Sequence, residues 1–189
     1  MPSALSDYYK RHHDQGKRRG QAFMHEARGH ILSNWIGTGK RVLDLGCRDG
    51  VLTTHFLPEN CVVGADIDRT ALAHCRQSLD IGVLQVNLNA PLPLGSDMFD
   101  VVVMAEVLEH LPYLTITLSE VSRVLHEDGV LLGSVPLDLS VKGRWRIMRG
   151  KRICHDPTHL QHWSLRTFEE DMAAYFHLDD YVVLRGTAL

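Results

Sequence analysis

One segment constrains the fold of this chain more than any other. Residues 41–50 read RVLDLGCRDG, a short apolar run followed at once by a turn that contains two glycines. An apolar run that meets a glycine turn is typical of a buried strand, and the turn then leads into the next element. The segment therefore predicts a strand over 41–45, a turn, and a short helix over 50–57.

The same alternation of apolar runs and longer amphipathic segments continues along the chain. Further strands are predicted at 61–65 (ending at Asp66), 81–86, 100–104, 129–135 (closed by Pro136) and 178–184. Helices are predicted over 23–36, from the N-cap Asp68 to Arg76, from Leu114 to Leu125, and around Phe168, Met172 and Tyr175. Apolar strands joined by long crossovers predict a doubly wound, mostly parallel α/β sheet with helices on both faces.

The length of 189 residues indicates one domain with a sizeable core. We expect residues 1–38 to form an N-terminal helical cap and residues 39–189 the main domain. Residues 137–163 combine proline, glycine, histidine and basic residues. They are interpreted as an insertion with at most one short helix. We expect the whole insertion to act as a mobile lid over the substrate.

The chemistry of the first turn restricts its ligand. In open α/β sheets the ligand lies beyond the carboxyl ends of the strands, and glycine lets the backbone approach it closely. The turn lacks the G-x-G-x-x-G spacing of a pyrophosphate site, because Arg48 stands at the second glycine position. Asp44 at the strand end opposes a pyrophosphate and suits a cationic ligand with an amino group. These features argue against an NAD-type oxidoreductase.

The segment VLDLGCRDG resembles the first motif of class I S-adenosylmethionine (SAM)-dependent methyltransferases, roughly V-L-D-L-G-C-G-x-G, with Arg48 replacing the middle glycine. Three later segments also resemble motifs of that family: FDVV from Phe99, EHL from Glu109, and E-x-x-R-V-L from Glu120. The resemblance covers residues 40–135. It implies a Rossmann-like fold, SAM as cofactor, and methyl transfer to an oxygen, nitrogen or carbon atom of a small molecule.

The resemblance also implies roles for single residues. Asp44 would orient the amino end of the methionine moiety, and Asp66 would accept both ribose hydroxyls. Asn87 would lie near the adenine amino group. The full set of expected cofactor-binding residues is Asp44, Leu45, Gly46, Cys47, Gly50, Asp66, Ile67, Asn87, Leu88, Ala105 and Glu106.

Arg48 is the main departure from the family pattern. An arginine fits such a turn if its φ is negative and its side chain points outward, and we expect that conformation here. The departure leaves a second hypothesis open, in which the chain binds SAM as a partner or regulatory protein without catalytic activity.

His110 and His155 are the candidate catalytic residues, as general bases for the methyl acceptor. His110 is expected at a short helix end above the fourth strand, and His155 lies in the insertion. The run 142–152 contains six basic residues and no acid, which favours an anionic small-molecule acceptor. A net charge of −3 and a pI of about 6.4 argue against nucleic acid, and no apolar run is long enough for a membrane span.

The cysteine and histidine residues of the insertion raise the question of a metal. Cys154, His155, His159 and His162 are close in sequence, but Pro157 interrupts any helix that would align them, and no second ligand pair is present elsewhere. We therefore expect no metal. The scattered cysteines form no C-x-x-C pair, which indicates a reducing, cytoplasmic setting.

Overall fold

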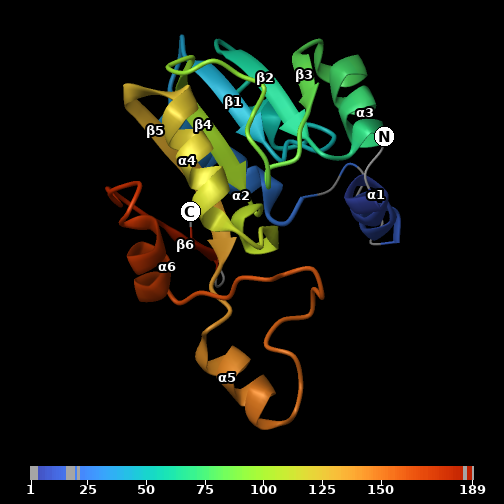
Figure 1. The fold of residues 1–189 in the computed structure, drawn as a ribbon, viewed down its shortest axis with the longest axis vertical. Helices are drawn as coiled ribbons and strands as arrows, with labels where there is room; N and C mark the ends of the chain where they lie inside the picture. The colour runs from blue at the N-terminus through green and yellow to red at the C-terminus, as the bar shows by residue number, and fades with distance from the viewer. Residues whose placement is uncertain (1–3, 16–19, 21, 185–186, 189) are drawn as a thin grey trace.

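The computed structural model describes residues 4–15, 20, 22–184 and 187–188, and Figure 1 shows a central sheet flanked by helices. The strands are β1 (Arg41–Leu45), β2 (Cys61–Asp66), β3 (Gly82–Gln85), β4 (Phe99–Ala105), β5 (Leu125–Pro136), β6 (Val183–Leu184) and β7 (Thr187–Ala188). Their order in the sheet is β3-β2-β1-β4-β5-β7-β6. The five strands from β3 to β5 in this order run parallel to one another. Strand β7 is antiparallel to both of its neighbours, β5 and β6.

The helices cover both faces of this sheet, so the predicted doubly wound α/β fold is confirmed. The α-helices are α1 (Ala4–Gln15), α2 (His25–Ile36), α3 (Arg69–Leu79), α4 (Leu114–Val124), α5 (Val141–Met148) and α6 (Leu165–Met172). Two 3-10 turns, η1 (Thr53–His55) and η2 (Leu108–His110), follow β1 and β4. Each turn lies just beyond the carboxyl end of its strand.

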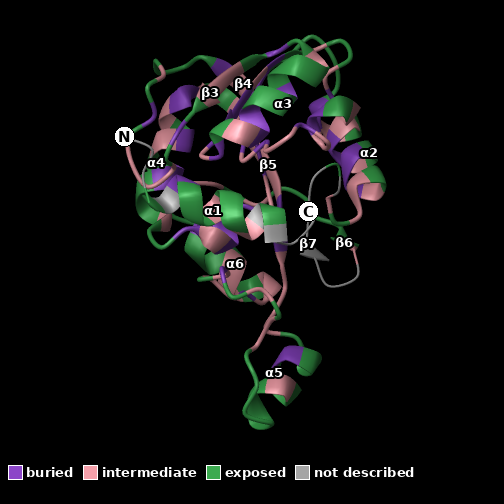
Figure 2. Cartoon of the chain, turned by 90° about the vertical axis from the view of Figure 1, so that its right-hand side faces the viewer, coloured by how far each residue is buried: buried purple, intermediate pink, exposed green. Residues whose placement is uncertain are grey.

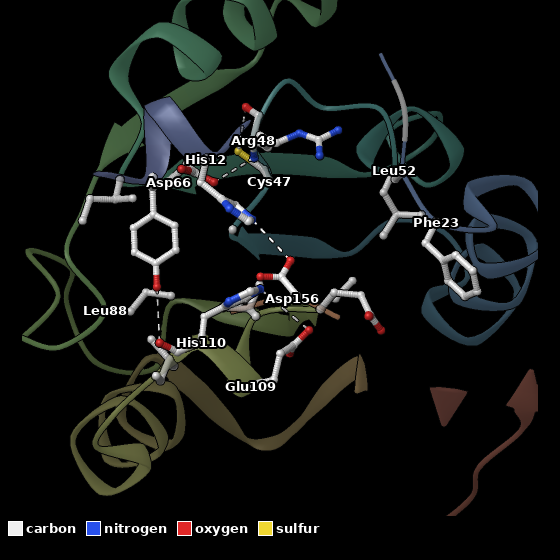
Figure 3. A pocket seen from close by; sticks show the side chains of 18 of the residues that line it. His12, Phe23, Cys47, Arg48, Leu52, Asp66, Leu88, Glu109, His110 and Asp156 are labelled. Atoms are coloured by element: carbon white, nitrogen blue, oxygen red, sulfur yellow. Dashed lines mark hydrogen bonds and ion pairs between the residues drawn. The ribbon is translucent and has the colours of Figure 1, made fainter. Parts of the chain in front are cut away.

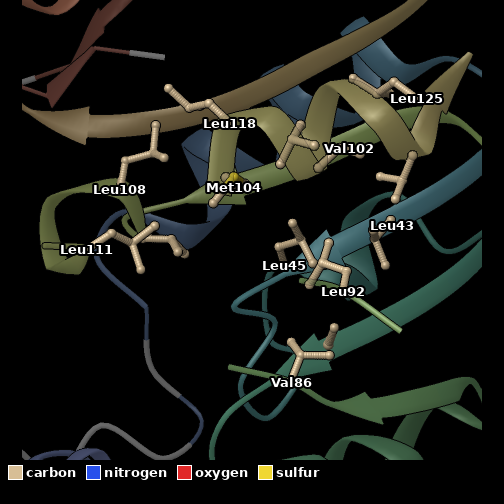
Figure 4. Close-up of a cluster of buried hydrophobic side chains, with 14 of the residues drawn as sticks. Leu43, Leu45, Val86, Leu92, Val102, Met104, Leu108, Leu111, Leu118 and Leu125 are labelled. Atoms are coloured by element: carbon tan, nitrogen blue, oxygen red, sulfur yellow. The ribbon is translucent and has the colours of Figure 1, made fainter. Parts of the chain in front are cut away.

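The period-two alternation of the buried strands divides the core into two layers. Leu43 and Leu45 of β1 pack with Val102 and Met104 of β4 against Leu118 of α4, as Figure 4 shows. The intervening residues of the same strands face α2, α3 and η1, where the buried residues include Leu32, Ile36, Val42, Phe56, Leu72, Cys75, Val101 and Val103. Buried acids also lie at the carboxyl ends of the strands, among them Asp44 and Asp66.

Asp68 confirms the helix start predicted from its short carboxylate. Its side chain accepts the backbone N–H groups of Thr70 and Ala71 at 2.9 and 3.2 Å, and α3 begins at Arg69. The cap satisfies two of the donors that the first turn of a helix leaves free.

The structure corrects three predicted elements. The segment 50–57 contains only the three-residue turn η1 instead of a helix. The predicted strand 178–184 is wrong over most of its length, because only Val183–Leu184 is extended and paired. The fifth strand starts before Gly129, at Leu125, through a register shift opposite β4.

The insertion 137–163 has two structurally distinct parts. Helix α5 projects away from the body of the protein, as both Figure 1 and Figure 2 show. The chain then returns as an irregular segment, residues 154–163, that packs on η2. Leu160 and Gln161 donate backbone N–H groups to the carbonyl of Glu109, and Trp163 is buried in the core.

None of the helices in the described ranges has the length and apolar character that a membrane crossing requires.

Gly133 on β5 provides a test of how closely the two central strands pack. A Cβ atom at this position would lie 2.2 Å from the carbonyl oxygen of Met104, which is backbone and has no freedom to move aside. Gly133→Ala should lower the free energy of unfolding by about 1–3 kcal/mol in denaturant titrations. Gly82→Ala is the matched control, because its nearest neighbour would lie 3.9 Å away. Equal stability of the two variants would contradict this packing.

Candidate functional site

The carboxyl ends of β1, β2 and β4 open onto a cavity of about 640 Å³. In Figure 3 the side chains of Cys47, Arg48 and Asp66 lie along one side of it, and Glu109 and His110 lie along the opposite side. Residues of α1, α2 and the return segment of the insertion complete the walls. The cavity therefore occupies the position where open α/β sheets bind ligands.

The turn after β1 is held in an unusual backbone conformation. Gly46 has a φ of 81°, and a Cβ atom there would lie 2.4 Å from Cγ2 of Val107. Arg48 has a φ of 52°, so the expectation of a negative φ at this position is wrong. An arginine in the left-handed region costs energy that the surrounding contacts must offset.

The carboxylate of Asp66 provides those contacts. Its Oδ2 accepts the backbone N–H of Arg48 at 3.0 Å, and its Oδ1 accepts the backbone N–H of Asp68 at 2.7 Å. The side chain of Arg48 forms an ion pair with Asp49, in which Nε donates to Oδ1 at 3.1 Å. Asp66 thus fixes the turn after β1 from the end of β2, while its side chain still lines the cavity.

Asp44 is a buried acid below the turn. Its Oδ2 accepts the hydroxyl hydrogen of Thr53 at 2.6 Å, and only 3% of the residue is exposed. Burial raises the pKa of Asp44 to about 7, against the opposing effect of the Thr53 hydrogen bond. A cationic group in the cavity would stabilise the ionised form of this carboxyl group.

Two further acids follow β4. Glu106 has a φ of 58°, and its Oε1 accepts the hydroxyl of Ser134 at 3.0 Å. Glu109 is fully buried, and neither of its carboxylate oxygens has a hydrogen-bond partner among the described residues. Burial raises the pKa of both groups, and the proximity of Glu106 raises the pKa of Glu109 further.

Arg28 of α2 supplies positive charge to this acidic wall. It is 2% exposed and lines the cavity, and its Nη1 donates to the carbonyl of Phe23 at 2.9 Å. Its Nε has no hydrogen-bond partner within the described part of the chain. Burial lowers the pKa of Arg28, while Glu106, Glu109 and Asp44 oppose that shift. An unsatisfied buried guanidinium N–H at a cavity wall suits an anionic group of a ligand.

His110 occupies the wall opposite Asp66. Its Nδ1 lies 3.0 Å from the hydroxyl oxygen and 3.2 Å from the carbonyl oxygen of Thr158. The Thr158 hydroxyl donates to Asp156 at 2.6 Å, so both Thr158 oxygens can accept from Nδ1–H. This assignment leaves Nε2 of His110 as a proton acceptor. Burial lowers the pKa of His110 to about 4, so the ring is neutral at pH 7.

His155 has a different environment. The residue is exposed, and its Nε2 lies 2.9 Å from Nη1 of Arg146, which can only donate. The lone pair of Nε2 is therefore engaged by the arginine. His155 lines the cavity, but Arg146 and the other basic residues of the run 142–152 do not.

Most of the residues expected to bind the cofactor lie at this cavity. The lining includes Asp44, Gly46, Cys47, Asp66, Ile67, Asn87, Leu88, Ala105 and Glu106. Leu45 and Gly50 do not line it: the Leu45 side chain is fully buried in the core, and Gly50 borders a separate hollow. The expected site residues did not include several others that line the cavity, among them Tyr9, His12, Arg28, Asp156 and His159, and Glu109 of the predicted EHL motif lines it as well.

Of these, Arg28 left a signal in the sequence. It is spaced four and eight residues before Leu32 and Ile36, so it lies on the buried face of α2. A charge on an apolar helix face indicates either a buried ion pair or a ligand contact. The remaining missed residues depend on where α1 and the return segment lie, which no local pattern specifies.

Among the residues that the structure describes, two groups of side chains have metal-ligating atoms within 4.8 Å of one another. One consists of Glu109, His110 and His159, and the other of Asp138, Cys154 and His159. Cys154 and His159 belong to the insertion residues considered above, whereas His155 is in neither group. The absence of a metal remains a prediction.

Comparison with known proteins defines the class of this protein. The sequence model of the methyltransferase domain family matches residues 16–175. A probable S-adenosylmethionine-dependent methyltransferase of Mycobacterium tuberculosis is 38% identical over 101 residues, which are 52% of this chain and 36% of that protein. A ubiquinone biosynthesis O-methyltransferase of Nitrosococcus oceani is 30% identical over 97 residues, covering 48% of this chain and 41% of that protein.

Solved structures of methyltransferases share the fold. A methyltransferase of Haloferax volcanii, in complex with the activator Trm112, has a TM-score of 0.72 at 18% identity and covers 97% of this chain and 80% of its own. A TehB-like SAM-dependent methyltransferase of Corynebacterium glutamicum has a TM-score of 0.66 at 16% identity, with coverages of 98% and 95%.

The family model confirms the resemblance to methyltransferases seen in the sequence, and the solved structures show the same fold. The chain belongs to the methyltransferase domain family. It spans about two fifths of the length of the curated relatives named above. The names of the Mycobacterium tuberculosis and Corynebacterium glutamicum proteins give SAM as the methyl donor.

The raised pKa of Asp44 leads to a prediction about stability. Asp44 has an ordinary pKa of 3.8 in the unfolded chain and about 7 in the folded one. Between these values the folded state holds a proton that the unfolded state has lost, so stability falls as pH rises from about 4 to 7. Asp44→Asn removes this term. Relative to the variant, the wild-type protein should lose about 3–4 kcal/mol of unfolding free energy over that range.

Denaturant titrations of the two proteins from pH 4 to pH 8 measure the difference directly. Parallel curves for the wild-type protein and the variant would show that Asp44 is ionised throughout the range.

Proposed function

We propose that this protein transfers a methyl group from SAM to a small-molecule acceptor, with a hydroxyl group as the acceptor site. The main observation in its favour is that one cavity has a candidate cofactor site on one side and a candidate base on the other. One wall bears Asp66 and the turn after β1, and the other bears the neutral ring of His110. Bound SAM would supply an electrophilic methyl group on a sulfonium.

The residues of the first wall fit the polar groups of SAM. Asp66 lines the cavity and accepts backbone N–H groups there, and a carboxylate is the type of acceptor that two ribose hydroxyls require. Asp44 suits the amino group, and the unpartnered Nε of Arg28 suits the carboxylate of the methionine moiety. Asn87 and Leu88 lie where the adenine would be bound.

The charge of the cavity also suits a sulfonium. Its lining contains the acids Asp44, Asp49, Asp66, Glu106, Glu109 and Asp156, against the arginines Arg28 and Arg48. The expectation of an anionic acceptor depended on the basic run 142–152, which lies outside the lining. We therefore propose a small molecule whose recognition requires no negative charge.

His110 is the proposed general base, in preference to His155. A neutral imidazole that is unprotonated at Nε2 can take the proton of an acceptor hydroxyl as the new bond to carbon forms. The Nδ1 contacts with Thr158 hold the ring in one orientation. Positioning of the two substrates accounts for most of the rate, and proton removal adds to it. The O-methyltransferase named among the relatives is consistent with this chemistry.

The alternative of a SAM-binding protein without activity rested on Arg48. In the structure the turn keeps its positive φ values, and Asp66 holds Arg48 through its backbone. The substitution therefore leaves the shape of the turn intact, which supports the catalytic hypothesis. The proposed lid is restricted to the return segment 154–163, because only this part of the insertion borders the cavity.

Asp66→Ala should weaken SAM binding. Losing hydrogen bonds to a charged acceptor costs about 1.5–3 kcal/mol, which corresponds to a dissociation constant about 10- to 150-fold higher. Asp100→Ala is the matched control, because Asp100 binds Arg41 at the start of β4, outside the cavity lining. Calorimetric titration with SAM measures both variants. An unchanged dissociation constant for Asp66→Ala would exclude Asp66 from the cofactor site.

His110→Ala should reduce turnover while leaving the affinity for SAM within about twofold. The acceptor is first found by measuring transfer of a labelled methyl group from SAM to a panel of hydroxyl-bearing small molecules. With an accepted compound, loss of the base should lower kcat by about 10²- to 10⁴-fold. His74→Ala, on the exposed side of α3, should leave kcat unchanged. If His110→Ala retains wild-type kcat, the general-base role is wrong.

A further inference from the structure

Helix α5 exposes an apolar stripe to solvent. Val141, Trp145 and Met148 are spaced so that they share one face of the helix, and they are 86%, 56% and 72% exposed. Figures 1 and 2 show the helix projecting from the rest of the molecule, with most of its surface exposed. A solvated helix normally places polar residues on such a face. The exposure of these apolar side chains therefore suggests that the stripe contacts another molecule.

Basic residues border the stripe. Lys142, Arg144 and Arg149 are exposed on the same helix or at its end, and Lys151 and Arg152 follow. No aspartate or glutamate occurs between residues 139 and 155. The guanidinium of Arg149 lies 5.9 Å from the centre of the Trp145 ring. The exposed surface is thus both apolar and strongly cationic.

Specific contacts hold the inner side of α5. Ser140 caps the helix by accepting the backbone N–H of Gly143, and a Cβ atom on Gly143 would lie 1.9 Å from the carbonyl of Asp138. Arg146 donates from Nε to the carbonyl of Arg152 at 3.0 Å and approaches His155 through Nη1. These contacts hold α5 against the neighbouring residues of the insertion and leave the stripe exposed to solvent.

We propose that α5, with residues 149–152, binds the surface of an anionic lipid bilayer. The surface of such a bilayer has an outer layer of charged headgroups and an inner layer of acyl chains. An apolar stripe that contains tryptophan suits the inner layer, and the lysine and arginine residues that border it suit the outer one. The stripe enters the boundary between headgroups and acyl chains, and the cations contact the headgroup phosphates. Nucleic acid would also attract the cations, but it would leave Val141 and Met148 in water. This proposal concerns binding alone and does not depend on methyl transfer.

The test is co-sedimentation of the full chain with vesicles of phosphatidylglycerol and phosphatidylcholine, compared with phosphatidylcholine alone. The wild-type protein should bind the anionic vesicles, and added salt should weaken the binding. Trp145→Ser with Met148→Ser should abolish it. Lys142→Gln with Arg144→Gln and Lys151→Gln should weaken it about a hundredfold, at about fivefold per cation.

Matched controls separate this surface from general effects of charge and folding. Lys40→Gln with Arg69→Gln and Arg76→Gln removes three exposed cations elsewhere and should leave vesicle binding unchanged. Tyr113→Ser removes an aromatic side chain that is 65% exposed, outside α5, and should also have no effect. Circular dichroism and SAM affinity establish that the α5 variants remain folded.

Three results would overturn the proposal: no binding of the wild-type protein to anionic vesicles, retained binding after loss of the stripe, or an equal loss in the controls. In the first case, binding of a single-stranded RNA oligonucleotide would assign the surface to nucleic acid.

Discussion

The double hydrogen bond of the Asp66 carboxylate is the contact on which the rest of the site depends. It joins the turn after β1 to the start of α3, because one oxygen accepts from Arg48 and the other from Asp68. The parallel pairing of β1 with β2 brings these groups together at the same edge of the sheet. An arginine at a φ of 52° is tolerable there because its N–H has a charged acceptor. The middle glycine of the family motif is therefore replaceable in this chain without loss of the turn.

The same edge concentrates charge that is costly in an empty cavity. Burial raises the pKa of Asp44, Glu106 and Glu109. Arg28 in the cavity wall is almost fully buried, and its Nε has no hydrogen-bond partner among the described residues. A ligand with an ammonium group and a carboxylate at one end would satisfy both signs at once. The backbone is also strained at this site, because Arg48 and Glu106 adopt left-handed conformations. These residues follow β1 and β4.

Local sequence patterns specified the elements that form the sheet edge, because buried strands and helix caps are short-range features. The runs at 41–45 and 61–66 and the cap at Asp68 are found as predicted. The strand expected at 178–184 failed because an apolar run specifies no pairing partner. Only two of its residues find a place beside β7. The basic run at 142–152 was interpreted as a substrate contact, but α5 carries it away from the cavity, and no spacing rule indicates the direction of an insertion. The position of Arg28 on the buried face of α2 was visible in the sequence, but only the tertiary structure places its side chain at the cavity.

The number of protons released on SAM binding tests directly whether SAM lies against Asp44 at the end of β1. If the amino group of SAM lies against Asp44, its charge lowers the pKa of that carboxyl group from about 7, and binding at pH 6 releases up to about one proton. Calorimetric titration in two buffers with different ionisation enthalpies measures this number. The wild-type protein should release protons when it binds SAM at pH 6, and Asp44→Asn should not. Binding without proton release, or equal release by both proteins, would contradict the placement of SAM at the end of β1.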